Sequence, residues 1–334
     1  MSKILLLVIS VLVALNLQSA PTTAVLFSTN PSIVKVHVAN KDGNHGVGSG
    51  VVVAKDYIVT NCHVIADAQG VHVEKYGVSY PPEALIANWK NDLCILKFDN
   101  LPLPSVNLRP SKDLSYEEKV FSLTFPNDNP MPLPSYGKIK ALYPFQKSHI
   151  IRSSAGFTVG SSGGALFDLD FNLVGITTFK SPGRREGYYY CLPTEWIKEL
   201  LETKEQINLK SNAAPFWSLP EDQKPFFMRV VLPMQNEDWP LMLKITKSWT
   251  QADKENADAW YYLGFAQRKM MNLDFAKLFL KQALKLNNMH LDSLTELIEI
   301  SIEQKNKIEF NKVVNLISKI DESLATSYLD NNSL

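Results

Sequence analysis

Gly160-Ser161-Ser162-Gly163-Gly164 is the stretch of this 334-residue sequence on which the interpretation of the rest depends. A serine flanked by glycines can sit on a tight turn with its hydroxyl exposed, because glycine adopts positive φ at no steric cost. The same freedom lets two backbone N–H groups converge beside the hydroxyl, where they would stabilise an anion. We therefore predict that Ser162 is a nucleophile and that the N–H groups of Gly160 and Ser162 form an oxyanion hole.

Two upstream side chains are suited to activate this serine. His63 follows the strand-like run 57–60, and Asp92 opens the apolar run 93–97. Taken singly, such a histidine is usually a core residue and such an aspartate usually a turn residue. The chain order His63, Asp92, Ser162 is, however, that of one known triad, in which the histidine accepts the serine proton and the aspartate orients the imidazole. We predict that these three residues are catalytic.

The segment from about residue 25 to residue 205 is expected to be mostly β. Short β-branched runs recur between turn-forming loops, as in 32–38, 48–54 and 57–60. This spacing, with few helical periods, favours an antiparallel barrel or sandwich. A helical pattern at 194–201, with Thr194 as a plausible N-cap, is expected to close the domain.

Residues 46–192 resemble the trypsin-like serine peptidases of the HtrA/DegP type. The resemblance is carried by Gly48-Ser49-Gly50-Val51-Val52, Thr60-Asn61-Cys62-His63-Val64, Asp92-Leu93-Cys94-Ile95-Leu96-Lys97, Gly160-Ser161-Ser162-Gly163-Gly164-Ala165-Leu166, Val174-Gly175-Ile176 and Cys191-Leu192-Pro193. It implies a double antiparallel β-barrel over residues 25–205.

The same resemblance implies a substrate pocket. Its base would be Gly156, and the strand Ile176-Thr177-Thr178-Phe179 would line it and pair with the substrate backbone. Gly156 is not a carboxylate, so cleavage after Lys or Arg is not expected, and small or medium aliphatic residues are favoured. Thr158-Val159 replaces the Asn-Pro usual in this family. An oxyanion loop that is collapsed at rest and opened by a partner is therefore an alternative.

The C-terminal part of the chain changes to a helical period. Residues 206–235 have a linker-like composition, with prolines and with aromatic residues that indicate packing. Residues 236–325 predict an all-α domain similar to tetratricopeptide repeats, with one well-matched repeat at about 257–290. Small Gly264 and Ala283 fit the close contact of its two helices. The domain would either bind a protein or peptide on a concave surface or act as a helical cap, and it replaces the PDZ domains common in the HtrA type.

Composition excludes some partners. Lys plus Arg and Asp plus Glu both number 34, which gives no electrostatic reason to expect nucleic acid or an anionic membrane surface. The six histidines show no metal-ligand spacing, so neither a metal nor another cofactor is expected. Residues 1–20 read as a signal peptide, with a positive start and an apolar run too short to span a membrane. The three cysteines allow at most one disulfide, and we expect buried small side chains instead.

The sequence thus predicts an exported serine endopeptidase, periplasmic or secreted, that hydrolyses peptide bonds in protein or peptide substrates. Its mature form would have no membrane span. The alternative is a scaffold or binding protein that keeps the peptidase fold but has weak or no catalysis. The sequence does not predict the oligomeric state.

Overall fold

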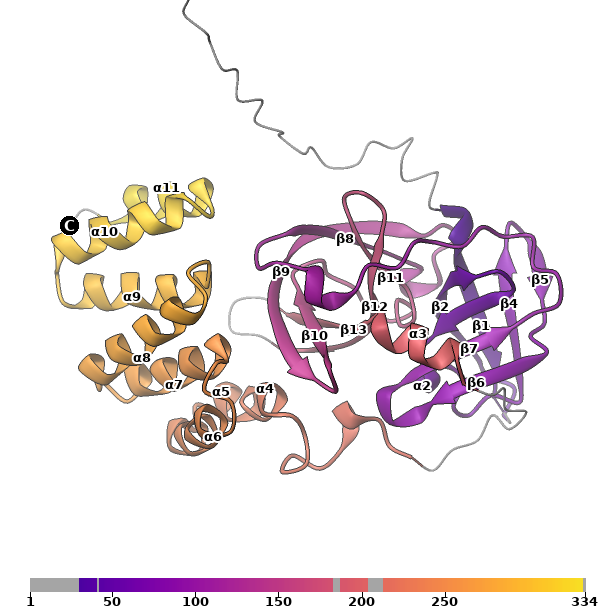
Figure 1. Cartoon of the computed structure of the whole chain (residues 1–334), viewed down its shortest axis with the longest axis horizontal. Helices are drawn as coiled ribbons and strands as arrows, with labels where there is room; N and C mark the ends of the chain where they lie inside the picture. The colour runs from indigo at the N-terminus through magenta and orange to yellow at the C-terminus, as the bar shows by residue number, and fades with distance from the viewer. Residues whose placement is uncertain (1–29, 41, 183–186, 204–212, 333–334) are drawn as a thin grey trace, which may run out of the picture.

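The computed structural model describes residues 30–40, 42–182, 187–203 and 213–332. The predicted signal peptide, residues 1–20, lies outside them, as does the first part of the predicted linker. Two β-sheet units are followed by a set of helices that curves along one side of the second unit (Figure 1). Among the described residues, no helix has the length and apolarity needed to cross a bilayer.

The first unit is a seven-stranded antiparallel sheet in the order β5-β4-β1-β2-β3-β7-β6. Alternating apolar side chains from its central strands form one core, which includes the buried Val34, Val52 and Leu96. The unit comprises β1 (Ile33–Ala39), β2 (His45–Ala54), β3 (Tyr57–Thr60), α2 (Cys62–Ile65), β4 (Gly70–Lys75), β5 (Val78–Tyr80), β6 (Ala84–Asn88) and β7 (Leu93–Lys97).

The second unit is a closed six-stranded barrel in the order β10-β13-β12-β11-β8-β9. It comprises β8 (Lys119–Thr124), β9 (Leu133–Phe145), β10 (Ser148–Ser153), β11 (Ala165–Asp168), β12 (Leu173–Ser181) and β13 (Tyr188–Pro193), and α3 (Glu195–Leu201) follows it. The predicted β architecture and the closing helix are confirmed. The loop that carries Ser162 leads directly into β11, at the junction of the two units.

The helical region begins inside the segment predicted as a linker. It comprises η5 (Phe216–Ser218), α4 (Phe226–Arg229), α5 (Val231–Gln235), α6 (Trp239–Ala252), α7 (Ala257–Lys269), α8 (Leu273–Leu286), α9 (Leu291–Glu303), α10 (Lys307–Ser318) and α11 (Glu322–Asn331). The predicted close contact inside the repeat is present, because a Cβ on Gly264 would lie 2.9 Å from Leu280 Cγ. Helices α7 and α8 pack against each other, and the repeat type itself stays a prediction.

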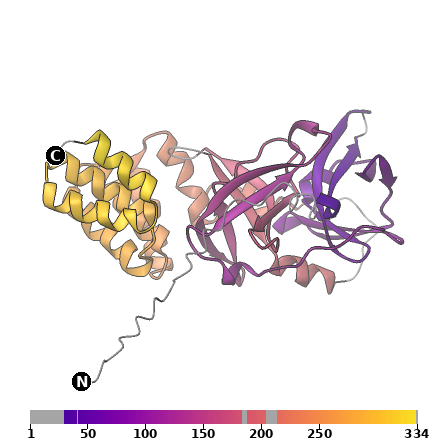
Figure 2. The same cartoon turned by 90° about the horizontal axis from the view of Figure 1, so that it is seen from above.

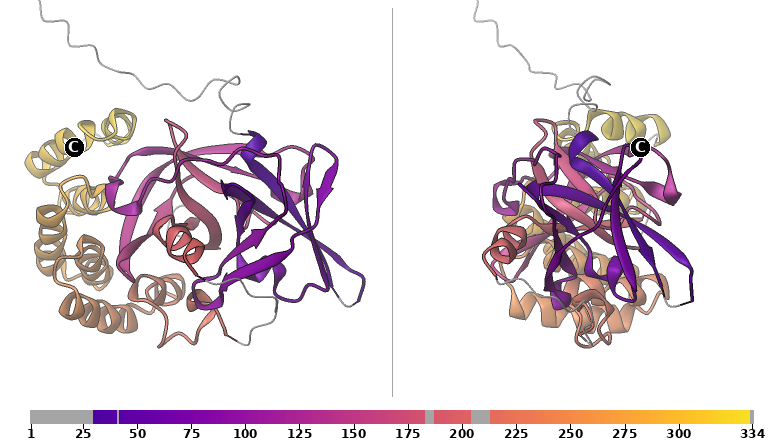
Figure 3. Two further views of the ribbon diagram at one scale, coloured as in Figure 1. Left: turned by 45° about the vertical axis from the view of Figure 1, so that its right-hand side comes forward. Right: turned by 90° about the vertical axis from the view of Figure 1, so that its right-hand side faces the viewer.

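The inner side of the helical arc packs on the second barrel, away from the first sheet (Figures 2 and 3). Tyr116 donates a hydrogen bond to Asp258 Oδ2 at 2.7 Å, and burial raises the pKa of Tyr116 well above its usual range, so it stays a donor. The ring of Phe227 in α4 stacks on Tyr143 in β9, with centroids 4.3 Å apart. Much of the concave surface considered for a partner therefore faces this chain's own barrel.

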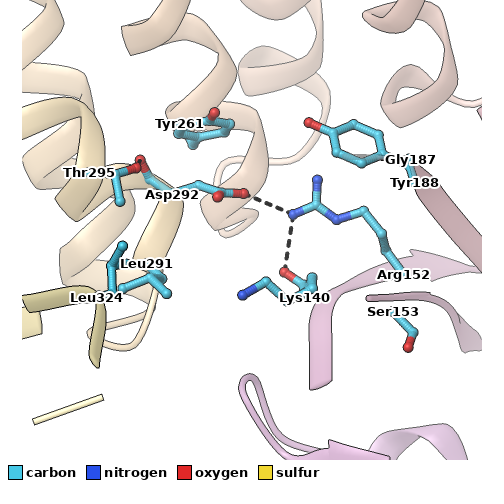
Figure 4. A pocket seen from close by; sticks show the side chains of 10 residues that line it. All are labelled: Lys140, Arg152, Ser153, Gly187, Tyr188, Tyr261, Leu291, Asp292, Thr295 and Leu324. Carbon is cyan, nitrogen blue, oxygen red and sulfur yellow. Dashed lines mark hydrogen bonds and ion pairs between the residues drawn. The ribbon is translucent and has the colours of Figure 1, made fainter. Parts of the chain in front are cut away.

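An ion pair between a buried arginine and a partly exposed aspartate crosses the same interface (Figure 4). Arg152 in β10 points from the barrel toward the helices, where Nη2 donates to Asp292 Oδ2 at 2.9 Å and Nη1 to the Tyr262 hydroxyl at 3.3 Å. Its guanidinium also lies over the ring of Tyr188, 4.5 Å from the centroid. Because the Arg152 side chain is only 2% exposed, its charge depends on these partners.

The expectation that all three cysteines are simple buried side chains is wrong for two of them. Cys62 and Cys94 form a disulfide, with their Cα atoms 4.9 Å apart. The pairing of β3 with β7 puts Thr60 opposite Cys94, and the chain then turns into α2, which brings Cys62 beside the same strand. Cys191 is a buried free thiol, and burial raises the pKa of that thiol.

Candidate active site

His63 and Asp92 are joined by two hydrogen bonds. His63 Nδ1 lies 2.6 Å from Asp92 Oδ2, and the His63 backbone N–H donates to Asp92 Oδ1 at 2.8 Å. The Asp92 side chain is 1% exposed, whereas that of His63 is 32% exposed. A buried carboxylate thus holds a partly open imidazole, which leaves Nε2 as the ring nitrogen free to face a reacting group.

The local backbone explains this arrangement. Asp92 ends a short 3-10 helix and adopts a left-handed conformation, with φ of 57°, just before β7. His63 lies on the single-turn helix α2, and its side chain turns out of the core toward Asp92. Cys62 instead turns into the core to meet Cys94. The disulfide therefore ties the residue before His63 to β7, which starts directly after Asp92.

The serine loop is clamped against the first sheet. Ser49 N–H in β2 donates to the Ser162 carbonyl at 2.8 Å. Gly163 adopts φ of +85°, and its N–H donates to the Thr177 carbonyl at 2.8 Å. A Cβ at Gly163 would lie 2.2 Å from Ser49 O and 2.4 Å from Thr60 Oγ1, so only glycine fits there.

The carbonyl groups of Val159 and Gly160, which precede the two serines, both accept hydrogen bonds. Val159 O accepts from Asn127 N–H at 2.7 Å, and Gly160 O accepts from Ser49 Oγ at 2.9 Å. Gly160 has φ of +86°. Among the described residues, the N–H groups of Gly160 and Ser162 have no hydrogen-bond acceptor, which leaves both available to a ligand.

The Ser162 hydroxyl contacts a neighbouring strand. Its Oγ donates to the Thr178 carbonyl at 3.3 Å, and no hydrogen bond joins it to His63 within the described residues. The same threonine links the two units, because Asn61 Nδ2 donates to Thr178 Oγ1 at 3.0 Å and to the Asp92 carbonyl at 2.9 Å. Thr178 and Asn61 thus connect Ser162 to Asp92, which in turn holds His63.

The predicted pocket residues have different environments. Ile176 and Thr177 are fully buried: Ile176 belongs to the core, and Thr177 Oγ1 supports the serine loop by donating to the Ser161 carbonyl at 2.6 Å. Gly156 is half-buried, and a Cβ there would lie 3.4 Å from the Tyr189 ring. Thr178 is nearly buried and contacts the serine through its carbonyl.

Residues 178–181 of β12 have a free edge. On one side, Phe179 to Ser181 pair with β13. On the other side, pairing with β11 and the serine loop ends at Thr177, and no strand within the described segments continues it. The unpaired backbone groups of this edge follow directly after Thr178, the residue that Ser162 touches.

Sequence reasoning missed Trp217. It lies in η5, and its indole Nε1–H donates to Asp92 Oδ2 at 3.0 Å. Its ring meets His63 edge-on, with centroids 5.6 Å apart. The aromatic residues of the predicted linker indicated that it packs, but no sequence pattern showed where. Across the described part of the chain, no cluster of three or more His, Cys, Asp or Glu side chains is arranged to hold a metal.

Comparison with known proteins supports the same assignment of the fold. Residues 48–176 match the trypsin-like peptidase domain family. The chain is 27% identical over 255 residues to mouse serine protease HTRA4, covering 70% of this chain and 48% of the relative. It is 31% identical over 202 residues to bovine serine protease HTR4, a match that covers 55% of this chain and 41% of the relative. A probable periplasmic serine endoprotease, DegP-like, from Halomonas elongata is 27% identical over 186 residues, a match that covers 53% of this chain and 38% of the relative.

Among solved structures, the Rv3671c protease from M. tuberculosis in its active form shares the fold. It has a TM-score of 0.51 and 18% identity, and the match covers 59% of this chain and 94% of that one. The chain spans less than half the length of the curated relatives named above. The resemblance seen in residues 46–192 is confirmed: the chain carries a trypsin-like peptidase domain and has HtrA and DegP proteins as relatives.

Proposed function

We propose that this chain, with its trypsin-like peptidase domain of the HtrA/DegP type, is an exported serine endopeptidase that cleaves protein or peptide substrates. Ser162 is the nucleophile, His63 the general base and acid, and Asp92 the carboxylate that orients the imidazole. The observation that carries the proposal is the buried Asp92 carboxylate, which accepts hydrogen bonds from both the backbone N–H and Nδ1 of His63. Periplasmic or secreted location and the signal peptide at 1–20 belong to the same proposal.

The chemistry follows from these positions. Ser162 Oγ leaves the Thr178 carbonyl, passes its proton to His63 Nε2 and attacks the substrate carbonyl carbon. The carbonyl oxygen becomes an oxyanion that the N–H groups of Gly160 and Ser162 bind, each donor contributing about 3 kcal/mol. The imidazolium then protonates the departing amine as the peptide bond breaks. Water, deprotonated by His63, hydrolyses the acyl-enzyme and restores the serine.

The free edge of β12 favours a peptide as the substrate. An extended chain that pairs with residues 178–181 would continue the barrel by one strand and run past Ser162. Gly156 has no side-chain carboxylate, so we propose small or medium aliphatic residues at the cleaved position, with Gly156 and Thr178 beside that side chain. Profiling with a peptide library checks this proposal, and a preference for cleavage after Arg would contradict it.

A second candidate function is a binding protein with weak or no catalysis. The observation that favours it is the Ser162 hydroxyl, which donates to Thr178 O and not to His63. Catalytic hydrogen bonds are often long in free enzymes and form on substrate binding, so the same geometry also fits a peptidase without substrate.

A fluorophosphonate probe distinguishes the two candidates. We expect wild-type protein to be labelled and Ser162→Ala to be unlabelled, since the probe reacts only with an activated serine. Absence of wild-type labelling under all conditions would support the binding protein. Labelling that requires an added peptide or protein would support a loop that is inactive at rest.

We further propose that the helical region acts as a cap on the barrel, because its inner side already contacts β9 and β10. The outer helices α8 and α10, with their exposed faces, are then the surface left for a protein partner. The region predicted as residues 236–325 would extend back to α4, since Phe227 is part of the contact.

Breaking the interfacial ion pair tests the cap. Asp292→Asn should lower the free energy of unfolding by about 2 kcal/mol, because it removes the counter-charge of buried Arg152 while Asp292 itself is partly hydrated. Asp274→Asn is the matched control, since Asp274 is 96% exposed in its pair with Lys277. Denaturant unfolding measures both. Equal stabilities of the two variants would contradict the cap.

A further inference from the structure

The residue next to Trp217 fixes where the indole can point. Phe216 is 5% exposed and lies against Phe145, 5.0 Å between ring centroids, and against Phe179, 5.8 Å. It also meets Trp196 of α3 edge-on. This aromatic cluster anchors η5 to the second barrel, so the Trp217 side chain that follows Phe216 is held beside the His63–Asp92 pair.

From that anchor, Trp217 reaches both members of the His63–Asp92 pair. Its Nε1–H donates to Asp92 Oδ2 at 3.0 Å, the same oxygen that receives His63 Nδ1 at 2.6 Å. Its ring meets His63 edge-on and stacks on Phe179 of β12, with centroids 5.8 Å apart. Within the described residues, the Asp92 carboxylate thus accepts three hydrogen bonds, two from His63 and one from Trp217.

We infer that Trp217 is a positioning residue for the triad, supplied by the segment that connects the peptidase domain to the helical region. The inference rests on the proposed function. The carboxylate of Asp92 can rotate about its Cβ–Cγ bond unless its oxygens are held, and the Trp217 donor fixes Oδ2 on the His63 side. The indole also covers that side of the pair, where His63 is partly open, and so keeps water from competing for Oδ2.

Trp217 lies outside the segment that matches the trypsin-like peptidase domain family. It lies 41 residues beyond the end of the matched peptidase segment at residue 176, and after the closing helix α3. On its C-terminal side, α4 docks through Phe227 on Tyr143. Residues 216–227 are therefore held to the barrel on both sides of the indole, and the Asp92 carboxylate receives a donor from outside the matched segment.

Trp217→Phe tests the inference, because it keeps an aromatic ring and removes the N–H. We expect the maximal rate of labelling by a saturable fluorophosphonate to fall about tenfold, with the half-saturating concentration unchanged. The acid limb of the pH–rate profile should move to higher pH, because a carboxylate that has lost a donor stabilises the imidazolium more strongly. Trp260→Phe is the matched control, since Trp260 Nε1 donates to Lys254 O at 2.7 Å in the helical region.

The outcomes separate the inference from the function it rests on. A labelling rate within twofold of wild type, or a fall that leaves the acid limb unmoved and lowers the melting temperature, would overturn the positioning role. If wild type is not labelled at all, the proposed function fails. The role of Trp217 is then tested by ¹H NMR of the low-field proton in the His63–Asp92 hydrogen bond. We expect this resonance to shift in Trp217→Phe and to keep its wild-type position in Trp260→Phe, and an unshifted resonance in Trp217→Phe would overturn the positioning role.

Discussion

Asp92→Asn is expected to slow acylation of Ser162 by about 10⁴-fold with the fold intact. The structure gives the reason, because Asp92 Oδ2 receives His63 Nδ1 at 2.6 Å. An asparagine at this position turns an N–H toward Nδ1 and moves the imidazole proton to Nε2, the nitrogen that must accept the serine proton. The rate of fluorophosphonate labelling measures the loss, and circular dichroism reports the fold.

Asp67→Asn provides the control for this substitution. Asp67 is an exposed carboxylate just after α2, so the same change of charge occurs near His63 without contact with it. We expect Asp67→Asn to be labelled at the wild-type rate. If Asp92→Asn were also labelled within tenfold of that rate, the imidazole would not depend on this carboxylate, and the triad assignment would be wrong.

Much of the peptidase unit could be predicted because its signals are local. Ser162 lies between glycines whose φ values the turn requires, and His63 and Asp92 each follow or open a strand that the β-branched pattern shows. Their chain order then supplied the long-range relation that no single window contains. The structure places His63 and Asp92 in direct contact, and Thr178 and Asn61 connect them to the serine.

The parts that could not be predicted depend on contacts between distant segments. Cys62 meets Cys94 only because a single-turn helix follows β3, and four residues are too few to give a helical period. Trp217 lies 125 residues from Asp92, in a segment whose composition indicates a linker. No local pattern assigns an indole N–H to a particular carboxylate.

For the helical region, the helices could be predicted from the sequence but their packing partner could not. The period of residues 257–290 predicted the helix pair, and Gly264 predicted the close contact inside it. Which face of the array would be occupied was open, because an apolar inner face suits a foreign peptide and the chain's own barrel equally well. Arg152 in a barrel strand carries no local signal of its partner, because Asp292 lies 140 residues away.

Gly163→Ala is expected to destabilise the protein and remove activity together. The added Cβ would lie 2.2 Å from Ser49 O and 2.4 Å from Thr60 Oγ1, two buried atoms that are joined by a hydrogen bond of 2.8 Å. Relief requires the serine loop to move off the first sheet, which breaks the bond from Ser49 N–H to Ser162 O. Positive φ adds strain for alanine, so the free energy of unfolding should fall by roughly 3 kcal/mol.

The effect on catalysis should exceed the effect on stability. A shift of about 1 Å in Ser162 relative to His63 costs about 10²-fold in rate, so labelling of the folded Gly163→Ala protein should fall at least that far. Gly70→Ala is the control, because no atom lies within 4 Å of its added Cβ, and it should leave both quantities unchanged. A Gly163→Ala protein with wild-type melting temperature and labelling rate would mean that the serine loop is not clamped between Ser49 and Thr177, and the oxyanion hole proposed at Gly160 and Ser162 would lose its support.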